Sequence, residues 1–195
     1  MSDLPLPAPP PPPSRVPGGL TLILGGARSG KSAFAVELGR QHGSGVTMIA
    51  TATALDADMA ERIARHRAER PGWDTIEEPR DLAGALQRVS AGQLALVDCL
   101  TLWVSNLMLY ELDEPTILDR AAAAAAVAAR RSAPTVVISN EVGLGVHPPS
   151  ELGRRYQDAL GRVNQLWAAA ADRALLLVAG RALILRDPWD VLTWT

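Results

Sequence analysis

Residues 20–32, LTLILGGARSGKS, decide the fold of this chain. A short apolar run, Leu20–Leu24, leads into Gly25–Ser32, which fits the pattern G-x-x-x-x-G-K-[ST]. The glycines let the backbone curl so that successive N–H groups point at phosphate oxygens, and a following helix presents its positive N-terminal end. We therefore predict a buried strand, a phosphate-binding loop (P-loop) and a helix over residues 31–41, in that order.

The side chains of this loop indicate how a nucleoside triphosphate is held. Lys31 supplies a cation for the β and γ phosphates, and Ser32 offers its hydroxyl to Mg²⁺. A carboxylate at the end of a neighbouring strand should complete the metal side, and Asp98 follows the apolar run LALV. An ordinary glycine turn is the alternative for the loop, and a helix cap is the alternative for Asp98. The guanine-reading sequence N-K-x-D of regulatory GTPases does not occur.

The pattern along the chain predicts an α/β fold. Further apolar runs, expected as buried strands, lie at 46–50, 94–100, 134–139 and 173–179. Helix-like stretches separate them at 56–70, 81–90, 116–131 and 150–172. Strands that are apolar on both faces and alternate with helices indicate a mainly parallel sheet flanked by helices. Residues 72–79 could add a strand, and the chain after Arg181 a last strand and a short helical turn.

Length and composition favour a single domain over residues 19–195, preceded by a disordered proline-rich tail at 1–18. The net charge of −2 argues against a sequence-independent grip on nucleic acid or on a membrane surface, and no run is long enough for a membrane span. We therefore expect small-molecule partners. The lone Cys99 lies in an apolar run and fits a reducing, cytoplasmic setting.

Polar residues that follow the apolar runs are candidates for a ligand site, because ligands of parallel sheets bind at the carboxyl ends of the strands. Thr51 follows the second run, and Asn140, Glu141 and His147 follow the fourth. Taken singly, Asn140 reads as a turn former and Glu141 as a solvated charge. His42 reads as a surface residue.

His66 stands among arginines in ERIARHRAER, on the border of the apolar stripe of a predicted helix. A neutral imidazole can attack phosphorus and carry a nucleotidyl group, while neighbouring arginines hold phosphate charge. Packing or solvent exposure is the more common explanation for a lone histidine on such a helix, and the arginines usually form a solvated face, so spacing alone does not establish the catalytic interpretation.

Five blocks in order, GGARSGKS, IATATALDADMAERIARHRAERPGW, LVDCLTLWVSNLM, ISNEVGLGVHP and GRVNQLWAAAAD, resemble the bifunctional adenosylcobinamide kinase / adenosylcobinamide-phosphate guanylyltransferase family of cobalamin biosynthesis. The resemblance implies a RecA-like P-loop NTPase fold, GTP and ATP as substrates with Mg²⁺, and a homo-oligomer such as a trimer. It implies phosphorylation of adenosylcobinamide, then transfer of GMP from GTP to adenosylcobinamide phosphate through a covalent histidine. That histidine matches His66, and the resemblance implies Lys31 as a second catalytic residue.

The resemblance also implies a set of nucleotide contacts. They fall on the P-loop (Gly25, Gly26, Ala27, Arg28, Ser29, Gly30, Lys31 and Ser32), on Ala50, Thr51 and Ala52, on Arg67, Ala68, Glu69 and Arg70, and on Glu77 and Asp98. Glu78 is the alternative to Glu77. Asp98 suits either the metal, with Ser32, or the ribose or base of the nucleotide.

Two other hypotheses compete with the bifunctional transferase. One is a monofunctional P-loop kinase of a small molecule, and the other is a nucleotide-binding regulatory or assembly module whose proline-rich tail recruits partners.

Overall fold

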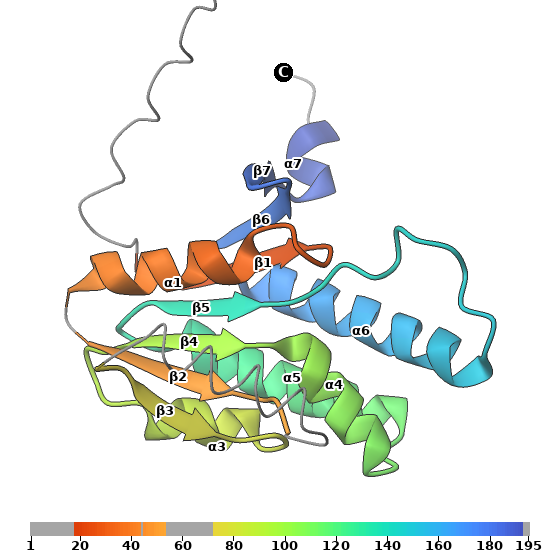
Figure 1. Cartoon of the computed structure of the whole chain (residues 1–195), viewed down its shortest axis with the longest axis horizontal. Helices are drawn as coiled ribbons and strands as arrows, with labels where there is room; N and C mark the ends of the chain where they lie inside the picture. Colours follow the sequence, from red (N-terminus) through yellow and green to blue (C-terminus); the bar gives the residue numbers. More distant parts are fainter. Residues whose placement is uncertain (1–17, 44, 54–71, 193–195) are drawn as a thin grey trace, which may run out of the picture.

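A computed structural model describes residues 18–43, 45–53 and 72–192 of the chain. Its strands form one sheet in the order β3-β2-β4-β5-β1-β6-β7 (Figure 1). All neighbouring strands are parallel except β7, which runs antiparallel to β6 at the sheet edge. The strands are β1 (Leu20–Gly25), β2 (Val46–Ala50), β3 (Asp74–Glu77), β4 (Leu94–Asp98), β5 (Thr135–Ile138), β6 (Arg173–Val178) and β7 (Arg181–Leu185).

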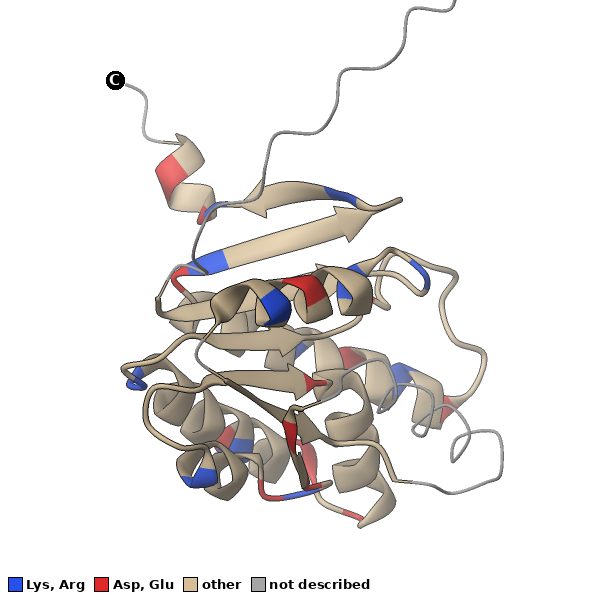
Figure 2. Ribbon diagram, turned by 60° about the vertical axis from the view of Figure 1, so that its left-hand side comes forward, with Lys and Arg blue, Asp and Glu red and all other residues tan. Residues whose placement is uncertain are grey.

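Helices cover both faces of this sheet. The described helices are α1 (Lys31–His42), α3 (Leu82–Arg88), α4 (Leu100–Leu109), α5 (Glu114–Ala129), α6 (Glu151–Ala170) and α7 (Pro188–Leu192). Strand β1 shows the alternation: Leu20, Leu22 and Leu24 pack in the cluster that includes α3, α4, α5 and α6, whereas Ile23 packs with Ala35 of α1. Both faces of the central strands are therefore buried, and Figure 2 shows that charged residues lie on helices, loops and strand ends.

Register aligns the carboxyl ends of the strands. Glu77 of β3 lies beside Ala50 of β2, which lies beside Asp98 of β4. Asp98 in turn lies beside Ile138 of β5, and Ile138 beside Ile23 of β1. One row of residues thus crosses five strands, and the P-loop begins two residues beyond its last member. Strand β5 lies between β4, which carries Asp98, and β1, which leads into the P-loop, so the expectation that Asp98 follows a strand next to β1 is wrong.

Adjacent capping side chains and one distant arginine fix the helix ends. Asp81, Asp113 and Ser150 cap α3, α5 and α6, each accepting a hydrogen bond from a backbone N–H of the first turn. The C-terminal end of α3 is held by Arg131, whose guanidinium donates to the carbonyls of Leu86, Val89 and Gln93 at 2.9–3.3 Å. Burial lowers the pKa of Arg131. None of the helices in the described ranges is long and apolar enough to cross a membrane.

The predicted α/β architecture is confirmed, including the strand within 72–79 and the strand and short helix after Arg181. Helix α4 was not predicted, because its sequence, LTLWVSNLML, is apolar on most sides and continues the apolar run of β4. His42, expected at the surface, is half-buried as the last residue of α1. The predicted helix at 56–70 and nearly all of the predicted tail at 1–18 lie outside the described residues, so they stay predictions.

Candidate nucleotide-binding site

A cavity of about 660 Å³ opens at the carboxyl ends of β1, β4 and β5. It lies where the sequence places the phosphate-binding residues. Its lining consists of the P-loop and first turn of α1 together with the ends of the two other strands: Ala27, Arg28, Ser29, Gly30, Lys31, Ser32, Ala33, Asp98, Cys99, Ile138 and Asn140.

Two glycines give the P-loop its path. Gly25, at φ 153°, passes so close to β6 that a Cβ there would overlap the carbonyl oxygen of Leu177. Gly30 adopts φ 97°, and a Cβ there would approach the Cα of Gly180 to 3.3 Å. Gly180, in the turn between β6 and β7, also donates its N–H to the carbonyl of Ser29 at 2.9 Å. The β6–β7 turn thus packs directly against the loop.

Lys31 is the buried cation of this cavity. Only 7% of it is exposed, and its Nζ donates a 2.7 Å hydrogen bond to the carbonyl of Gly26, which folds the side chain back over the loop. Burial lowers the pKa of Lys31, while Cys99 and Asp98 act in the opposite direction. Burial removes the water that would stabilise the charged amine, and a phosphate group in the cavity would stabilise that charge instead.

The peptide after β4 is held by Thr51. The hydroxyl of Thr51 accepts from Cys99 N at 2.8 Å and donates to Cys99 O at 2.7 Å, and all of these atoms are buried. The Thr51 carbonyl accepts from the carboxamide of Asn106 at 2.7 Å. Burial and the charge of Asp98 raise the pKa of the Cys99 thiol to about 11. Cys99 is the buried, uncharged thiol that the sequence suggested, and Thr51 ties the ends of β2 and β4 together.

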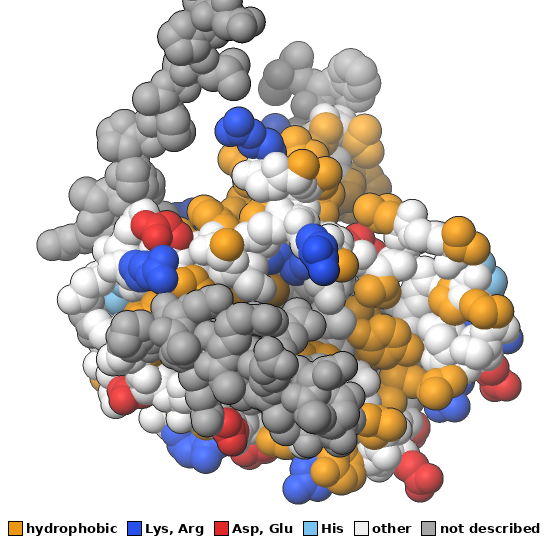
Figure 3. Space-filling model, viewed as in Figure 1, with side chains coloured by type: hydrophobic (Ala, Val, Ile, Leu, Met, Phe, Trp, Pro, Cys, Tyr) orange, Lys and Arg blue, Asp and Glu red, His pale blue; other side chains and the backbone are white. Residues whose placement is uncertain are grey.

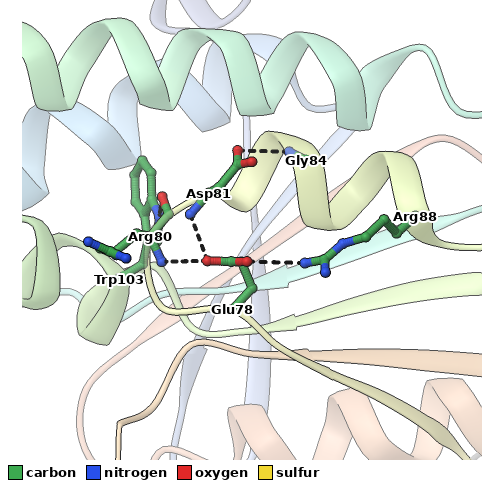
Figure 4. Close-up of polar contacts among 6 residues, drawn as sticks. All are labelled: Glu78, Arg80, Asp81, Gly84, Arg88 and Trp103. Carbon is green, nitrogen blue, oxygen red and sulfur yellow. Dashed lines mark hydrogen bonds and ion pairs between the residues drawn. The ribbon is translucent and has the colours of Figure 1, made fainter.

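Glu77, the last residue of β3, and Glu78, the next residue, differ in their surroundings. Figure 4 shows the contacts of Glu78. Glu78 accepts hydrogen bonds from the backbone N–H groups of Arg80 and Asp81 at 3.2 and 3.0 Å, and it pairs with Arg88 at 3.1 Å. It therefore fixes the start of α3. Glu77 is exposed and lies in the row with Ala50 and Asp98, a position that suits a ligand contact better. Its nucleotide contact stays a prediction.

The structure brings together most of the predicted site. P-loop residues 27–32 and Asp98 line one cavity, whereas Gly25 and Gly26 are not among its lining residues. Ala50 and Glu77 lie in the same row of the sheet as Asp98, with Ala52 half-buried just beyond it. His66, Arg67, Ala68, Glu69 and Arg70 lie outside the described residues. No group of three or more metal-binding side chains occurs in the ranges the structure describes. Ser32 and Asp98, which face the same cavity, supply two oxygen ligands of the kind that Mg²⁺ takes alongside phosphates and water.

Sequence reasoning singled out Asn140 without giving it a role, and it left out Ala33, Cys99 and Ile138 as lining residues. The role of the GRVNQ block becomes visible in Asn164, a buried residue of α6. Its carboxamide accepts from Ser139 Oγ at 2.6 Å and donates to Asn140 O at 3.1 Å. A polar residue inside an apolar helix face was the only signal in the sequence.

This fold and this cavity define a P-loop nucleotide-binding protein of the RecA-like class. Among solved structures, a protein from Pyrococcus horikoshii aligns with a TM-score of 0.54 and 8% identity over 91% of this chain and 90% of that chain. An ATPase of the bacterial type III secretion system aligns with a TM-score of 0.52 and 11% identity, over 83% of this chain and 51% of its own. These likenesses concern the fold alone.

The family follows from sequence similarity. Residues 21–185 match the model of the family described as cobinamide kinase / cobinamide phosphate guanyltransferase. The bifunctional adenosylcobalamin biosynthesis protein CobP of Pseudomonas aeruginosa is 46% identical over 168 residues, which are 85% of this chain and 96% of the relative. The corresponding protein CobU of Escherichia coli is 37% identical over 175 residues, 83% and 96% of the two chains. The chain belongs to this family of enzymes.

Proposed function

We propose that this protein catalyses both reactions of its family. In the first, it phosphorylates the aminopropanol hydroxyl of adenosylcobinamide with a nucleoside triphosphate. In the second, it transfers GMP from GTP to the resulting phosphate and releases pyrophosphate. The observation that carries the proposal is the pairing of near full-length similarity to bifunctional relatives with a cavity that gathers Lys31, Ser32 and Asp98.

Nucleotide binding is assigned to the P-loop cavity. The backbone of the loop and the N-terminal end of α1 suit the β phosphate, and Lys31 suits the oxygens between the β and γ phosphates. Ser32 and Asp98 would hold Mg²⁺, which neutralises phosphate charge when bound. The hydroxyl of adenosylcobinamide forms a bond to the γ phosphorus, the bond from that phosphorus to the nucleoside diphosphate breaks, and the hydroxyl proton is lost to solvent.

Guanylyl transfer is assigned to His66. An imidazole nitrogen forms a bond to the α phosphorus of GTP as the bond between the α phosphorus and the bridging oxygen breaks, and pyrophosphate leaves. A phosphate oxygen of adenosylcobinamide phosphate then attacks the same phosphorus, and the N–P bond breaks to give adenosylcobinamide-GDP. Arg67 and Arg70 are the proposed holders of phosphate charge, with Ala68 and Glu69 as neighbouring nucleotide contacts.

Labelling with GTP tests this assignment. We expect GTP labelled at the α phosphorus, incubated with the protein and Mg²⁺, to leave an acid-labile, alkali-stable label on the chain in a denaturing gel. The chain has three histidines, which provide matched controls: His66→Ala should abolish the label, while His42→Ala and His147→Ala should keep it. A label that survives His66→Ala would reject His66 as the nucleophile.

The same preparations separate the alternatives. Phosphorylation of adenosylcobinamide without a covalent label would support a monofunctional kinase. The absence of both reactions would support a regulatory nucleotide-binding module instead. Turnover of both steps by the wild-type chain would support the bifunctional enzyme.

We also propose that the enzyme is a homo-oligomer of the cytoplasm, such as a trimer, that acts on small molecules and not on nucleic acid. Exposed apolar side chains gather around β6, β7 and α7 at the sheet edge (Figure 3). They are Val178, Leu183, Ile184, Leu185, Trp189, Val191 and Leu192. We take this patch as support for self-association. Such a patch is typical of protein interfaces. The buried free thiol of Cys99 suits a reducing compartment, and sedimentation velocity would give the number of subunits.

A further inference from the structure

The segment that follows β5 is held in place by buried side chains of two helices. The N–H of Asn140 donates to Thr101 Oγ1 of α4 at 2.8 Å, and the carbonyl of Asn140 accepts from Asn164 of α6 at 3.1 Å. Asn164 also accepts from Ser139 Oγ at 2.6 Å. Thr101, Ser139 and Asn164 are 8%, 0% and 5% exposed. Both backbone polar groups of Asn140 are therefore fixed by buried partners.

The carboxamide of Asn140, unlike its backbone, has no hydrogen-bond partner among the described residues. Asn140 lines the cavity together with Lys31, Ser32 and Asp98. A buried network thus fixes the backbone of a cavity-lining residue and leaves its amide without a hydrogen bond among the described residues, which makes that amide available to a ligand.

Register places this amide on the outer side of the cavity. Asn140 lies two residues beyond Ile138, which is level with Asp98 on one neighbouring strand and with Ile23 on the other. At about 3.3 Å per residue, Asn140 stands about 7 Å further along the strand direction than Asp98. The next residue, Glu141, donates its N–H to the carbonyl of Gly25 at 3.2 Å, which keeps the segment alongside the start of the P-loop.

We propose that the carboxamide of Asn140 donates a hydrogen bond to the terminal phosphate group of the bound nucleoside triphosphate, and that Asn164 is a positioning residue that holds Asn140 there. This inference rests on the proposed function only in that the cavity binds a nucleoside triphosphate. If the loop and α1 hold the other phosphates, the terminal phosphate lies on the side of β4 and β5. There, the end of β5 forms the cavity wall between Asp98 and the loop.

An amide suits this place for electrostatic reasons. Lys31 already supplies the positive charge and Asp98 a negative one, so a neutral donor adds a directed contact without changing the net charge. A carboxylate at position 140 would instead face the phosphate with a like charge. The Asn140→Asp variant, which is nearly the same shape, should therefore bind the triphosphate worse than Asn140→Ala does.

Calorimetric titration with two nucleotides tests the contact. We would use guanosine triphosphate with a methylene bridge between the α and β phosphorus atoms, which His66 cannot cleave there, and the matching diphosphate, both with Mg²⁺. Asn140→Ala should weaken triphosphate binding by about 10- to 100-fold, the usual range for a lost hydrogen bond to a charged group, and leave diphosphate binding within about twofold. An unchanged ratio of the two affinities would overturn the contact.

The positioning role of Asn164 has its own comparison. Asn164→Ala, and the milder Ser139→Ala, should lower the same affinity ratio, although neither side chain lines the cavity. Gln157→Ala is the matched control, because Gln157 lies on the same helix and donates to Val142 O, two residues beyond Asn140. The ratio of triphosphate to diphosphate affinity should be the same in this variant as in the wild type. Equal ratios for Asn164→Ala, Ser139→Ala and the control would overturn the positioning role.

The proposed function can fail independently of this inference. A wild-type protein that binds both nucleotides, yet neither labels with GTP nor phosphorylates adenosylcobinamide, would reject the transferase assignment. The affinity ratio of the Asn140 variants would still decide the phosphate contact.

Discussion

Replacing Thr51 by valine should destabilise the protein and weaken its nucleotide site together. Valine has nearly the shape of threonine, so the substitution removes one hydroxyl without opening a cavity. That hydroxyl is buried and makes two hydrogen bonds with the backbone of Cys99, at 2.8 Å from its nitrogen and 2.7 Å to its carbonyl oxygen. The residue before Cys99 is Asp98, so the same bonds hold the proposed metal ligand.

The size of the effect follows from what each backbone group of Cys99 keeps. Its carbonyl still accepts a hydrogen bond from the N–H of Trp103 at 3.1 Å in α4, so losing the Thr51 hydroxyl costs it one of two partners. Its N–H loses the Thr51 bond and stays buried. An unpaired buried donor costs about 1–3 kcal/mol and a lost bond to the carbonyl about 1 kcal/mol, so we expect a loss of about 2–4 kcal/mol.

Thr51→Ser is the matched control, because it keeps the hydroxyl and removes only a methyl group, at about 1 kcal/mol. Thermal unfolding followed by circular dichroism should show Tm lowered by about 5–15 °C in Thr51→Val and by only a few degrees in Thr51→Ser. Titration with the methylene-bridged triphosphate and Mg²⁺ should show weaker binding for valine alone. If the two variants unfold at the same temperature, the hydroxyl does not hold the Cys99 backbone as argued.

Two further outcomes concern residues away from the cavity. Arg131→Ala should lower the free energy of unfolding in urea by about 2 kcal/mol, because two carbonyls at the end of α3 and one in the turn before β4 lose a charged donor. The exposed neighbour Arg130 should tolerate alanine within about 0.5 kcal/mol. Burial, with a smaller effect of Cys99, raises the pKa of Tyr156 from 10.0 to about 12. The folded state therefore holds the phenol proton that the unfolded state loses, and urea titrations should show stability falling between pH 10 and 12. This loss should be smaller in Tyr156→Phe, and equal losses in both proteins would contradict the assignment.

The P-loop and the sheet could be predicted because their signals are local. A glycine pattern between an apolar strand and a helix specifies the backbone of residues 25–32 without help from the rest of the chain. The apolar runs are buried on both faces and so read as parallel strands. Once the strands are parallel, their carboxyl ends share an edge, which puts Asp98 on the same edge as Lys31 and Ser32. The strand order, which leaves only β5 between β4 and β1, was not predicted.

The remaining features depend on contacts that no short pattern carries. Helix α4 looked like a continuation of β4, because nearly every side of it is apolar and only tertiary packing separates the two. Glu77 and Glu78 are adjacent in sequence, and only the position of α3 shows that Glu78 is used to hold Arg88 and the start of that helix. The role of Asn164 depends on where α6 passes β5, which its own sequence does not state.

These contacts show how the edge of the sheet that carries the proposed site is held together although its residues come from separate loops. Thr51 reaches the peptide after β4 from β2, and Asn164 reaches the segment after β5 from α6. Thr51 bonds only backbone groups of Cys99, whereas Asn164 bonds the Asn140 carbonyl and the Ser139 hydroxyl, so removing either side chain costs stability as well as geometry. The groups proposed to meet the phosphates are therefore only part of the site. The precision of that site depends equally on residues whose side chains point away from any ligand and into the core.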